Sequence, residues 1–171
     1  MSTLPIISVW QPWASLLVAG AKRIETRGWR FPLPLPCCLA IHAAKKWDEN
    51  LATLCVGEPF LRWLKACDMP PPRSGGRAPR PVGMPFGAVV GVVRVGQCWT
   101  SERAREVLGC ATGGDVERAF GDYGPGRYGW VTDARMRLAE PVPLRGQQGI
   151  WRWEPTAEAA AWAEAMGRGG A

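Results

Sequence analysis

The sequence predicts an α+β fold, a mixed and mostly antiparallel β-barrel with short helices around it. Five or six short segments rich in apolar and β-branched residues have the length and spacing of strands. The helical stretches between them do not alternate regularly with the strands, which disfavours a doubly wound parallel sheet. The chain has 171 residues, of which 47% are hydrophobic, so it is long and apolar enough for one domain with a proper core.

In the N-terminal part, hydrophobic periodicity and helix-capping residues predict a series of short elements. A helix that starts at Pro12 should end at Gly20, and the strand after it should place alternate side chains on opposite faces. We expect Arg23, Glu25 and Arg27 on one face of that strand, and Lys22, Ile24 and Thr26 on the other. In chain order, the predicted elements are strand Ile6–Val9, helix Trp13–Ala19, strand Lys22–Arg27, strand Cys38–Ala43, helix Asn50–Val56 and helix Pro59–Cys67.

The C-terminal part begins after a segment over residues 69–85 that is rich in Pro, Gly and Arg and lacks a hydrophobic period. We interpret it as a long loop, either a flap over a site or a tolerated insertion. On the closing strand we expect Trp151 to face inward and Trp153 to face the other way. The predicted elements are strand Phe86–Gln97, helices Ser101–Leu108 and Asp115–Phe120, strand Trp130–Leu138, strand Gly149–Trp153 and a helix capped by Thr156.

Residues 1–155 should form the domain, and residues 156–171 a C-terminal helix with a flexible tail. The net charge of +6 and the pI of about 9.3 fit a polyanionic partner. The ten tryptophans are an unusually large number for this length. We expect most to fill the core and some to line a cleft, where an indole can stack on a base.

Several classes of function are disfavoured by residues that the chain lacks. The six cysteines include no C-x-x-C pair and His42 is the only histidine, so we expect no structural zinc, no cofactor and no two-histidine nuclease mechanism. Reduced thiols indicate the cytoplasm. No apolar run reaches the roughly 18 residues of a membrane span, and no signal peptide is evident. The oligomeric state has no signal in the sequence.

The first 27 residues carry a motif that points to a known family. A short strand precedes Gln11-Pro12-Trp13, and the turn and strand that follow contain a G-x-K-x-x-E-x-R pattern. That pattern consists of Gly20, Lys22, Glu25 and Arg27. Residues 39–45, 86–93 and 145–153 are similar to later strands of the same family. Over residues 6–153 the chain therefore resembles the ASCH domain family.

The resemblance implies a PUA-like barrel that binds RNA or a modified nucleobase. One bacterial branch consists of amidohydrolases that remove the acetyl group from N4-acetylcytidine, which is the alternative function. That branch uses a Lys, a Thr three residues later and a distant Glu. Here Lys22 is present, Glu25 occupies the second position and Thr26 follows it. Lys22, Glu25 and Thr26 are thus the catalytic candidates, and the distant Glu would be Glu102, Glu106 or Glu117.

The partner would be RNA, a nucleoside or a modified nucleobase, held by a further set of side chains. Glu25 can accept a hydrogen bond from an exocyclic amine, and the planar guanidinium of Arg27 suits a phosphate or carbonyl. Trp29 is the better stacking candidate, whereas Trp13 at a helix start suits the core. His42 is either a proton carrier or a packed residue, and Gln148 either a donor to base edges or a turn residue. The binding candidates are Trp10, Gln11, Arg27, Trp29, His42, Arg145 and Gln147.

Overall fold

The computed structural model describes residues 3–70, 78 and 80–168, and its elements confirm the α+β class. Most helices and strands begin and end within a few residues of the predicted bounds. The six strands are β1 (Leu4–Val9), β2 (Ile24–Arg27), β3 (Cys37–Ala43), β4 (Ala88–Thr100), β5 (Tyr128–Pro143) and β6 (Ile150–Trp153). The six helices are α1 (Trp13–Ala19), α2 (Glu49–Val56), α3 (Phe60–Ala66), α4 (Ser101–Cys110), α5 (Gly114–Ala119) and α6 (Ala157–Arg168).

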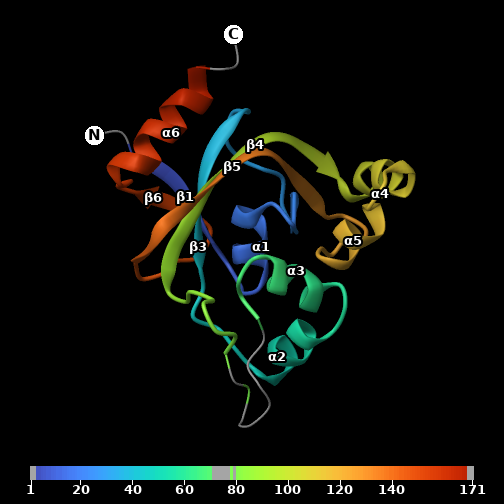
Figure 1. Cartoon of the computed structure of the whole chain (residues 1–171). Helices are drawn as coiled ribbons and strands as arrows, with labels where there is room; N and C mark the ends of the chain where they lie inside the picture. Colours follow the sequence, from blue (N-terminus) through green and yellow to red (C-terminus); the bar gives the residue numbers. More distant parts are fainter. Residues whose placement is uncertain (1–2, 71–77, 79, 169–171) are drawn as a thin grey trace.

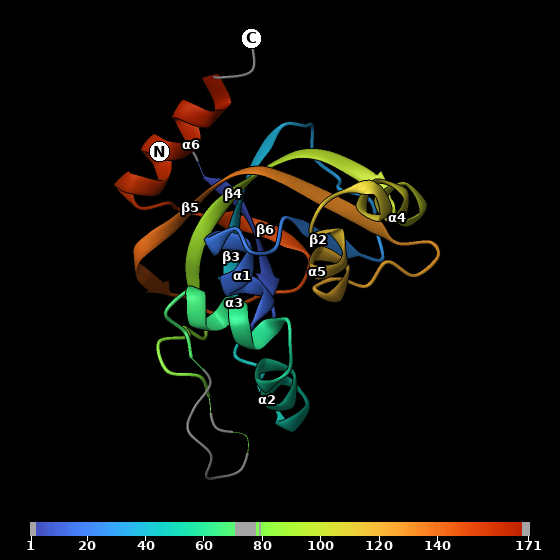
Figure 2. The same ribbon diagram turned by 45° about the vertical axis from the view of Figure 1, so that its right-hand side comes forward.

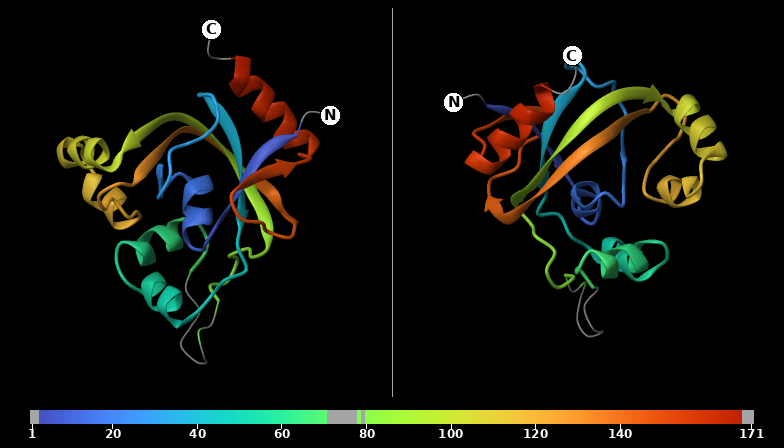
Figure 3. Two further views of the ribbon diagram at one scale, coloured as in Figure 1. Left: turned by 180° about the vertical axis from the view of Figure 1, so that it is seen from behind. Right: turned by 45° about the horizontal axis from the view of Figure 1, so that its top comes forward.

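The strands form one sheet in the order β2-β5-β4-β3-β1-β6. Within the described part of the chain only the β1–β3 pair is parallel, so the sheet is mostly antiparallel as predicted. The closed barrel is not observed, because β2 pairs only with β5, β6 pairs only with β1, and no pairing joins these two edges among the described residues. The sheet instead curls around α1 (Figures 1 and 3). It stays open between its edge strands, where Arg27 of β2 reaches the end of β1 that β6 leaves unpaired.

Helix α1 lies inside the curve of the sheet and packs against β1, β3, β4 and β5. Its Leu17 and Val18 join Ile7, Ile41 and Trp130 in the main apolar cluster. The other side of α1 packs through Leu16 against α3 and Phe120, so the helix is buried from both directions. Figure 2 shows α2 and α3 on one side of α1, and α4 and α5 at the far end of β4 and β5.

The outer face of the sheet is covered by α6, which begins with Thr156 accepting a hydrogen bond from the Ala159 amide. Ala159 is fully buried in a cluster that includes Trp153, and Trp151 packs against the same cluster. The prediction of opposite faces for the two tryptophans was therefore wrong. Residues two positions apart on a strand share a face, and Trp153 is the more deeply buried of the two.

Two other predictions need correction or fall outside the described residues. The strand expected from Lys22 begins only at Ile24, so strand alternation does not apply to Lys22 and its side chain reaches the side of Glu25. Of the loop expected over residues 69–85, positions 71–77 and 79, including Arg73 and Arg77, lie outside the described residues. At the two ends of that loop, Met69 and Met84 are buried against Phe60 and Leu64.

The close approach of α1 to β4 depends on Gly91. A Cβ atom at this position would lie 2.3 Å from the Met136 carbonyl oxygen and 2.8 Å from Val18 Cγ1. We predict that Gly91→Ala lowers the free energy of unfolding by about 1–3 kcal/mol, because backbone and helix must move apart. Urea denaturation checks this.

Gly109 in α4 is the matched control, because a Cβ atom there would meet nothing within 4 Å. Gly109→Ala should leave stability unchanged or raise it by up to about 1 kcal/mol through helix propensity. Equal midpoints for the Gly91→Ala variant and the unmodified protein would contradict the proposed close contact.

Candidate functional site

The opening between β1 and β2 contains a cavity of about 610 Å³, which we call the seam cavity. This volume lies within the range of small-ligand pockets. The walls come from the end of β1, from β2 and the residues around it, and from the segment after α5. The lining residues are Ser8, Val9, Trp10, Trp13, Lys22, Glu25, Thr26, Arg27, Gly28, Trp29, Ala119, Phe120, Gly121, Asp122 and Arg127.

The Lys22 ammonium group is almost completely buried in the wall of this cavity. It donates hydrogen bonds to the carbonyl oxygens of Ile24 and Phe120, the latter at 3.0 Å, and lies 3.7 Å from Glu25 Oε2. Burial lowers the pKa of Lys22, whereas the charges of Glu25 and Glu117 act to raise it. The lysine therefore ties the start of β2 to the segment that follows α5.

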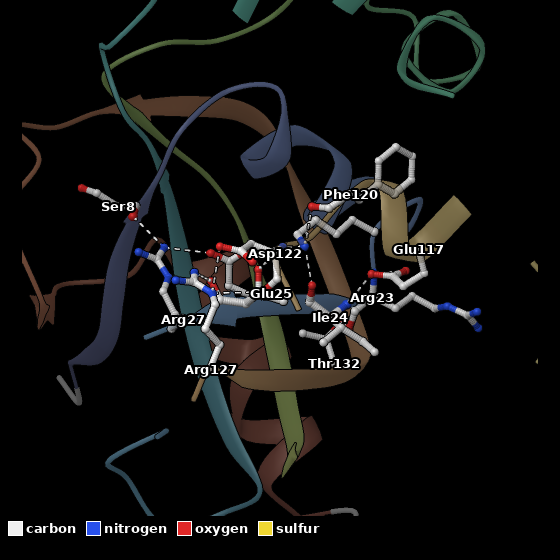
Figure 4. Close-up of polar contacts among 12 residues, drawn as sticks. Ser8, Arg23, Ile24, Glu25, Arg27, Glu117, Phe120, Asp122, Arg127 and Thr132 are labelled. Carbon is white, nitrogen blue, oxygen red and sulfur yellow. Dashed lines mark hydrogen bonds and ion pairs between the residues drawn. The ribbon is translucent and has the colours of Figure 1, made fainter. Parts of the chain in front are cut away.

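Arg27 bridges the two sides of the opening. Its Nη2 donates to Glu25 Oε1 at 2.9 Å within β2 and to the Ser8 carbonyl oxygen of β1 at 3.0 Å (Figure 4). Its Nε is buried and has no hydrogen-bond partner among the described residues. The side chain thus replaces the missing main-chain pairing between β1 and β2, and it leaves an unsatisfied donor in the cavity wall.

The remaining charged groups of the cavity follow α5 in the chain. Arg127 Nε donates to the Asp122 carbonyl oxygen at 3.0 Å and lies 3.3 Å from Asp122 Oδ2. Thr26 Oγ1 accepts from the Asp122 amide at 3.0 Å. Sequence reasoning missed Asp122, Arg127 and Ser8, because no local motif marks them and only the fold brings them to β2.

Most tryptophans lie in or against the core, whereas the two most exposed ones line the seam cavity. Trp130 and Trp153 are buried, and six others are partly buried against apolar clusters. Only Trp10 and Trp29 are classed as exposed, at 48% and 37%, and both line the seam cavity. Trp29 packs edge-on against Trp130 with ring centroids 4.7 Å apart, and Lys46 Nζ lies 3.7 Å above the Trp10 ring.

Four predicted binding residues lie elsewhere. Gln11 is fully buried, and its side chain hydrogen-bonds Ser15 and the Pro85 carbonyl oxygen, so it shapes the start of α1. His42, Arg145 and Gln147 line a second cavity of about 740 Å³, the loop cavity, beneath the β5–β6 loop. Its lining residues are Ser8, His42, Ala44, Lys45, Gly87, Pro143, Leu144, Arg145, Gly146, Gln147 and Gln148.

None of the three glutamates proposed as a distant carboxylate lines the seam cavity. Glu102 and Glu106 lie on the exposed side of α4 and pair with Arg105 and Arg103. Glu117 is buried on α5 and accepts hydrogen bonds from the amides of Arg23 and Ile24, at 2.9 and 3.0 Å (Figure 4). Its carboxylate holds the backbone just before β2.

The described residues contain no cluster of three or more His, Cys, Asp or Glu side chains suited to a metal ion. All six cysteines are free thiols. Within the described part of the chain, no helix combines the length and the apolar character that crossing a membrane requires.

Glu117 can be tested as the residue that positions β2. We predict that Glu117→Gln lowers the free energy of unfolding by about 1–3 kcal/mol, because the new amide NH₂ would face a backbone N–H donor. Glu106→Gln on the exposed face of α4 is the control and should change stability very little. Urea denaturation of both variants distinguishes them, and identical midpoints would contradict the role of Glu117.

Comparison with known proteins shows the family to which the chain is similar. The model of the ASCH domain matches residues 7–140. The human protein Activating signal cointegrator 1 is 31% identical over 146 residues, which are 85% of this chain and 22% of that protein. The chain thus spans less than a quarter of the length of that relative.

Two solved structures from Zymomonas mobilis are similar over 95% of this chain. The ASCH protein itself is 15% identical, with a TM-score of 0.46 and 94% of its chain covered. A mutant form is 14% identical, with a TM-score of 0.48 and 98% covered. Since the family model covers most of the sequence, the chain belongs to the ASCH domain family.

Proposed function

We propose that the seam cavity binds a nucleobase, presented by RNA or by a modified nucleoside. The observation that carries the proposal is the pairing of Trp10 and Trp29, the exposed indoles, with a buried network of charges in one cavity. Exposed indoles are costly in water, whereas a base can stack on either one. The cavity volume of about 610 Å³ is sufficient for such a ligand.

The polar wall is suited to the edge of a base that carries an exocyclic amine. Glu25 is held by Arg27 through one oxygen and faces Lys22 with the other, so lone pairs remain on the carboxylate. A carboxylate accepts from the cytosine amine, and the guanidinium donates to a neighbouring carbonyl. These groups are fixed before any ligand arrives, which reduces the entropic cost of binding.

Family membership and charge support RNA as the source of the base. The resemblance to ASCH proteins implies RNA binding, and the net charge of +6 favours a polyanion. The free thiols fit the reducing conditions of the cytoplasm, where we propose that the protein acts.

Replacing Trp29 tests the stacking role. We predict that Trp29→Ala weakens binding of cytidine or an RNA oligonucleotide by about 1–3 kcal/mol, roughly 5- to 150-fold in Kd. The variant should remain folded, because the Trp29 indole is partly exposed. The main-chain carbonyl oxygen of residue 29, which accepts a hydrogen bond from Trp130 Nε1, is retained. Calorimetric titration and thermal unfolding measure the two effects.

Trp99 provides the matched control, because it is partly exposed but does not line the seam cavity. Trp99→Ala should leave affinity for the ligand unchanged. Equal loss of affinity in both variants, or no binding by the unmodified protein, would argue against the proposed function.

The second candidate function is hydrolysis of N4-acetylcytidine or a related acyl-cytosine. It is favoured by the position of Lys22, whose buried ammonium lies in the cavity wall beside Glu25. Thr26, the next residue of β2, lines the same cavity. In this reaction Glu25 would accept a proton from water, and the resulting hydroxide would attack the acetyl carbon. Lys22 would stabilise the oxyanion. As the C–N bond breaks, Glu25 would return its proton to the leaving N4 nitrogen, which gives acetate and cytidine.

Chromatography of N4-acetylcytidine incubated with the protein tests this candidate. We predict release of cytidine that falls at least a hundredfold in Glu25→Gln, because the carboxamide does not accept a proton from water. Lys65→Ala on the exposed side of α3 is the control and should retain full turnover. If the folded, unmodified protein binds the nucleoside without releasing acetate, the enzymatic candidate is wrong and the binding function stands.

A further inference from the structure

We infer that the ligand is a single-stranded oligonucleotide that occupies both the seam cavity and the loop cavity, with a base in the first and backbone phosphate in the second. The inference rests on the proposed function, since it takes the seam cavity as the base site. It adds that a free nucleoside fills only part of the binding surface.

The two cavities are adjacent, because Ser8 lines both. Its carbonyl oxygen accepts from Arg27 on the seam side, and its hydroxyl group hydrogen-bonds His42 Nδ1 at 3.0 Å on the loop side. The antiparallel partner of β1 ends before this point, since the last β1–β6 pair is Ile7 with Ile150. The edge of β1 at Ser8 is therefore free of strand pairing on that side, and a chain can pass from one cavity to the other.

The linings of the two cavities differ in charge. The seam cavity contains the carboxylates of Glu25 and Asp122 as well as cations, which suits the mixed donors and acceptors of a base edge. Among the residues that the structure describes, the loop cavity is lined by Lys45 and Arg145 and by no acidic residue. Two cations without a carboxylate form a site for a phosphate rather than for a base.

The wall of the loop cavity is held in a defined conformation, because a buried histidine binds the β5–β6 loop. His42 is 1% exposed, and its Nε2 lies 3.0 Å from the Leu144 carbonyl oxygen. A carbonyl only accepts, so Nε2 carries the proton and Nδ1 accepts from Ser8. Gly146 lies directly over this pair, since a Cβ atom there would be 2.6 Å from His42 Cε1. The loop thus presents Arg145 and Gln147 at a fixed distance from β1.

A further cation lies beside the seam cavity, although it lines neither cavity. Lys46 follows Lys45 in the chain and lies over the Trp10 ring, and Trp10 lines the seam cavity. A nucleotide that stacks on Trp10 would therefore have Lys46 beside it and Lys45 of the loop cavity next in line. This order of aromatic and basic groups is typical of surfaces that follow a single strand.

Titration with ligands of increasing length tests the inference. The probes are cytidine, a seven-nucleotide oligocytidine RNA and the DNA oligomer of the same sequence, each measured at several salt concentrations. We expect the oligonucleotides to bind at least tenfold more tightly than cytidine. In the double variant Lys45→Ala/Arg145→Ala this advantage should be lost while cytidine affinity is unchanged. The salt dependence of log Kd should decrease by about 1.4, which is about 0.7 for each lost phosphate contact.

The control is Arg62→Ala/Lys65→Ala, which removes two exposed cations of α3 that line neither cavity. The inference would be overturned if oligonucleotides bound no better than cytidine. It would also be overturned if the double variant lost affinity for cytidine and for oligonucleotides to the same degree. Either result would leave the proposed function standing. Failure of cytidine and oligonucleotides alike would overturn both. Tighter binding of DNA or of RNA would support the inference and identify the natural strand.

Discussion

The buried ammonium of Lys22 is the constraint on which the site depends. Moving a charged amine out of water costs several kcal/mol unless partners replace the lost hydration. Here the partners are two carbonyl oxygens and Glu25, contributed by the start of β2 and by the segment after α5. Because those segments are nearly a hundred residues apart, satisfying one ammonium fixes the relative position of two cavity walls. Glu117 supports the same junction from behind through two backbone amides.

The opening between the edges of the sheet is the second feature on which the seam cavity depends. Two unpaired strand edges usually have to be covered or protected. Here Arg27 spans the gap to Ser8, so the edges stay apart at a fixed distance and the space between them becomes the seam cavity. Backbone pairing of β2 with the end of β1 at Ser8, which β6 leaves unpaired, would fill this space and leave no room for a ligand. The open sheet is therefore the structural basis of the seam cavity.

The sequence was sufficient to predict most elements, because their signals are local. Hydrophobic periodicity, Gly20 and the Thr156 cap each act within a few residues. The motif also indicated that Lys22, Glu25 and Arg27 belong together, and all three line the seam cavity. What was missed depends on contacts between distant residues. The open sheet, the burial of Gln11 and the placement of His42 in a separate cavity follow from strand order, which leaves no local pattern.

The tryptophan content illustrates how composition and structure complement each other. Ten indoles are many for a chain of 171 residues, and eight of them are buried in apolar clusters or partly buried against them. The two most exposed, Trp10 and Trp29, are nineteen positions apart in the chain, yet both line one cavity beside Glu25 and Arg27. Composition predicted that some indoles would be free, and only the fold could show which ones. Exposed indoles and polar groups meet where the sheet fails to close, so in the proposed function affinity for a base and selection among bases would arise from the same feature of the fold.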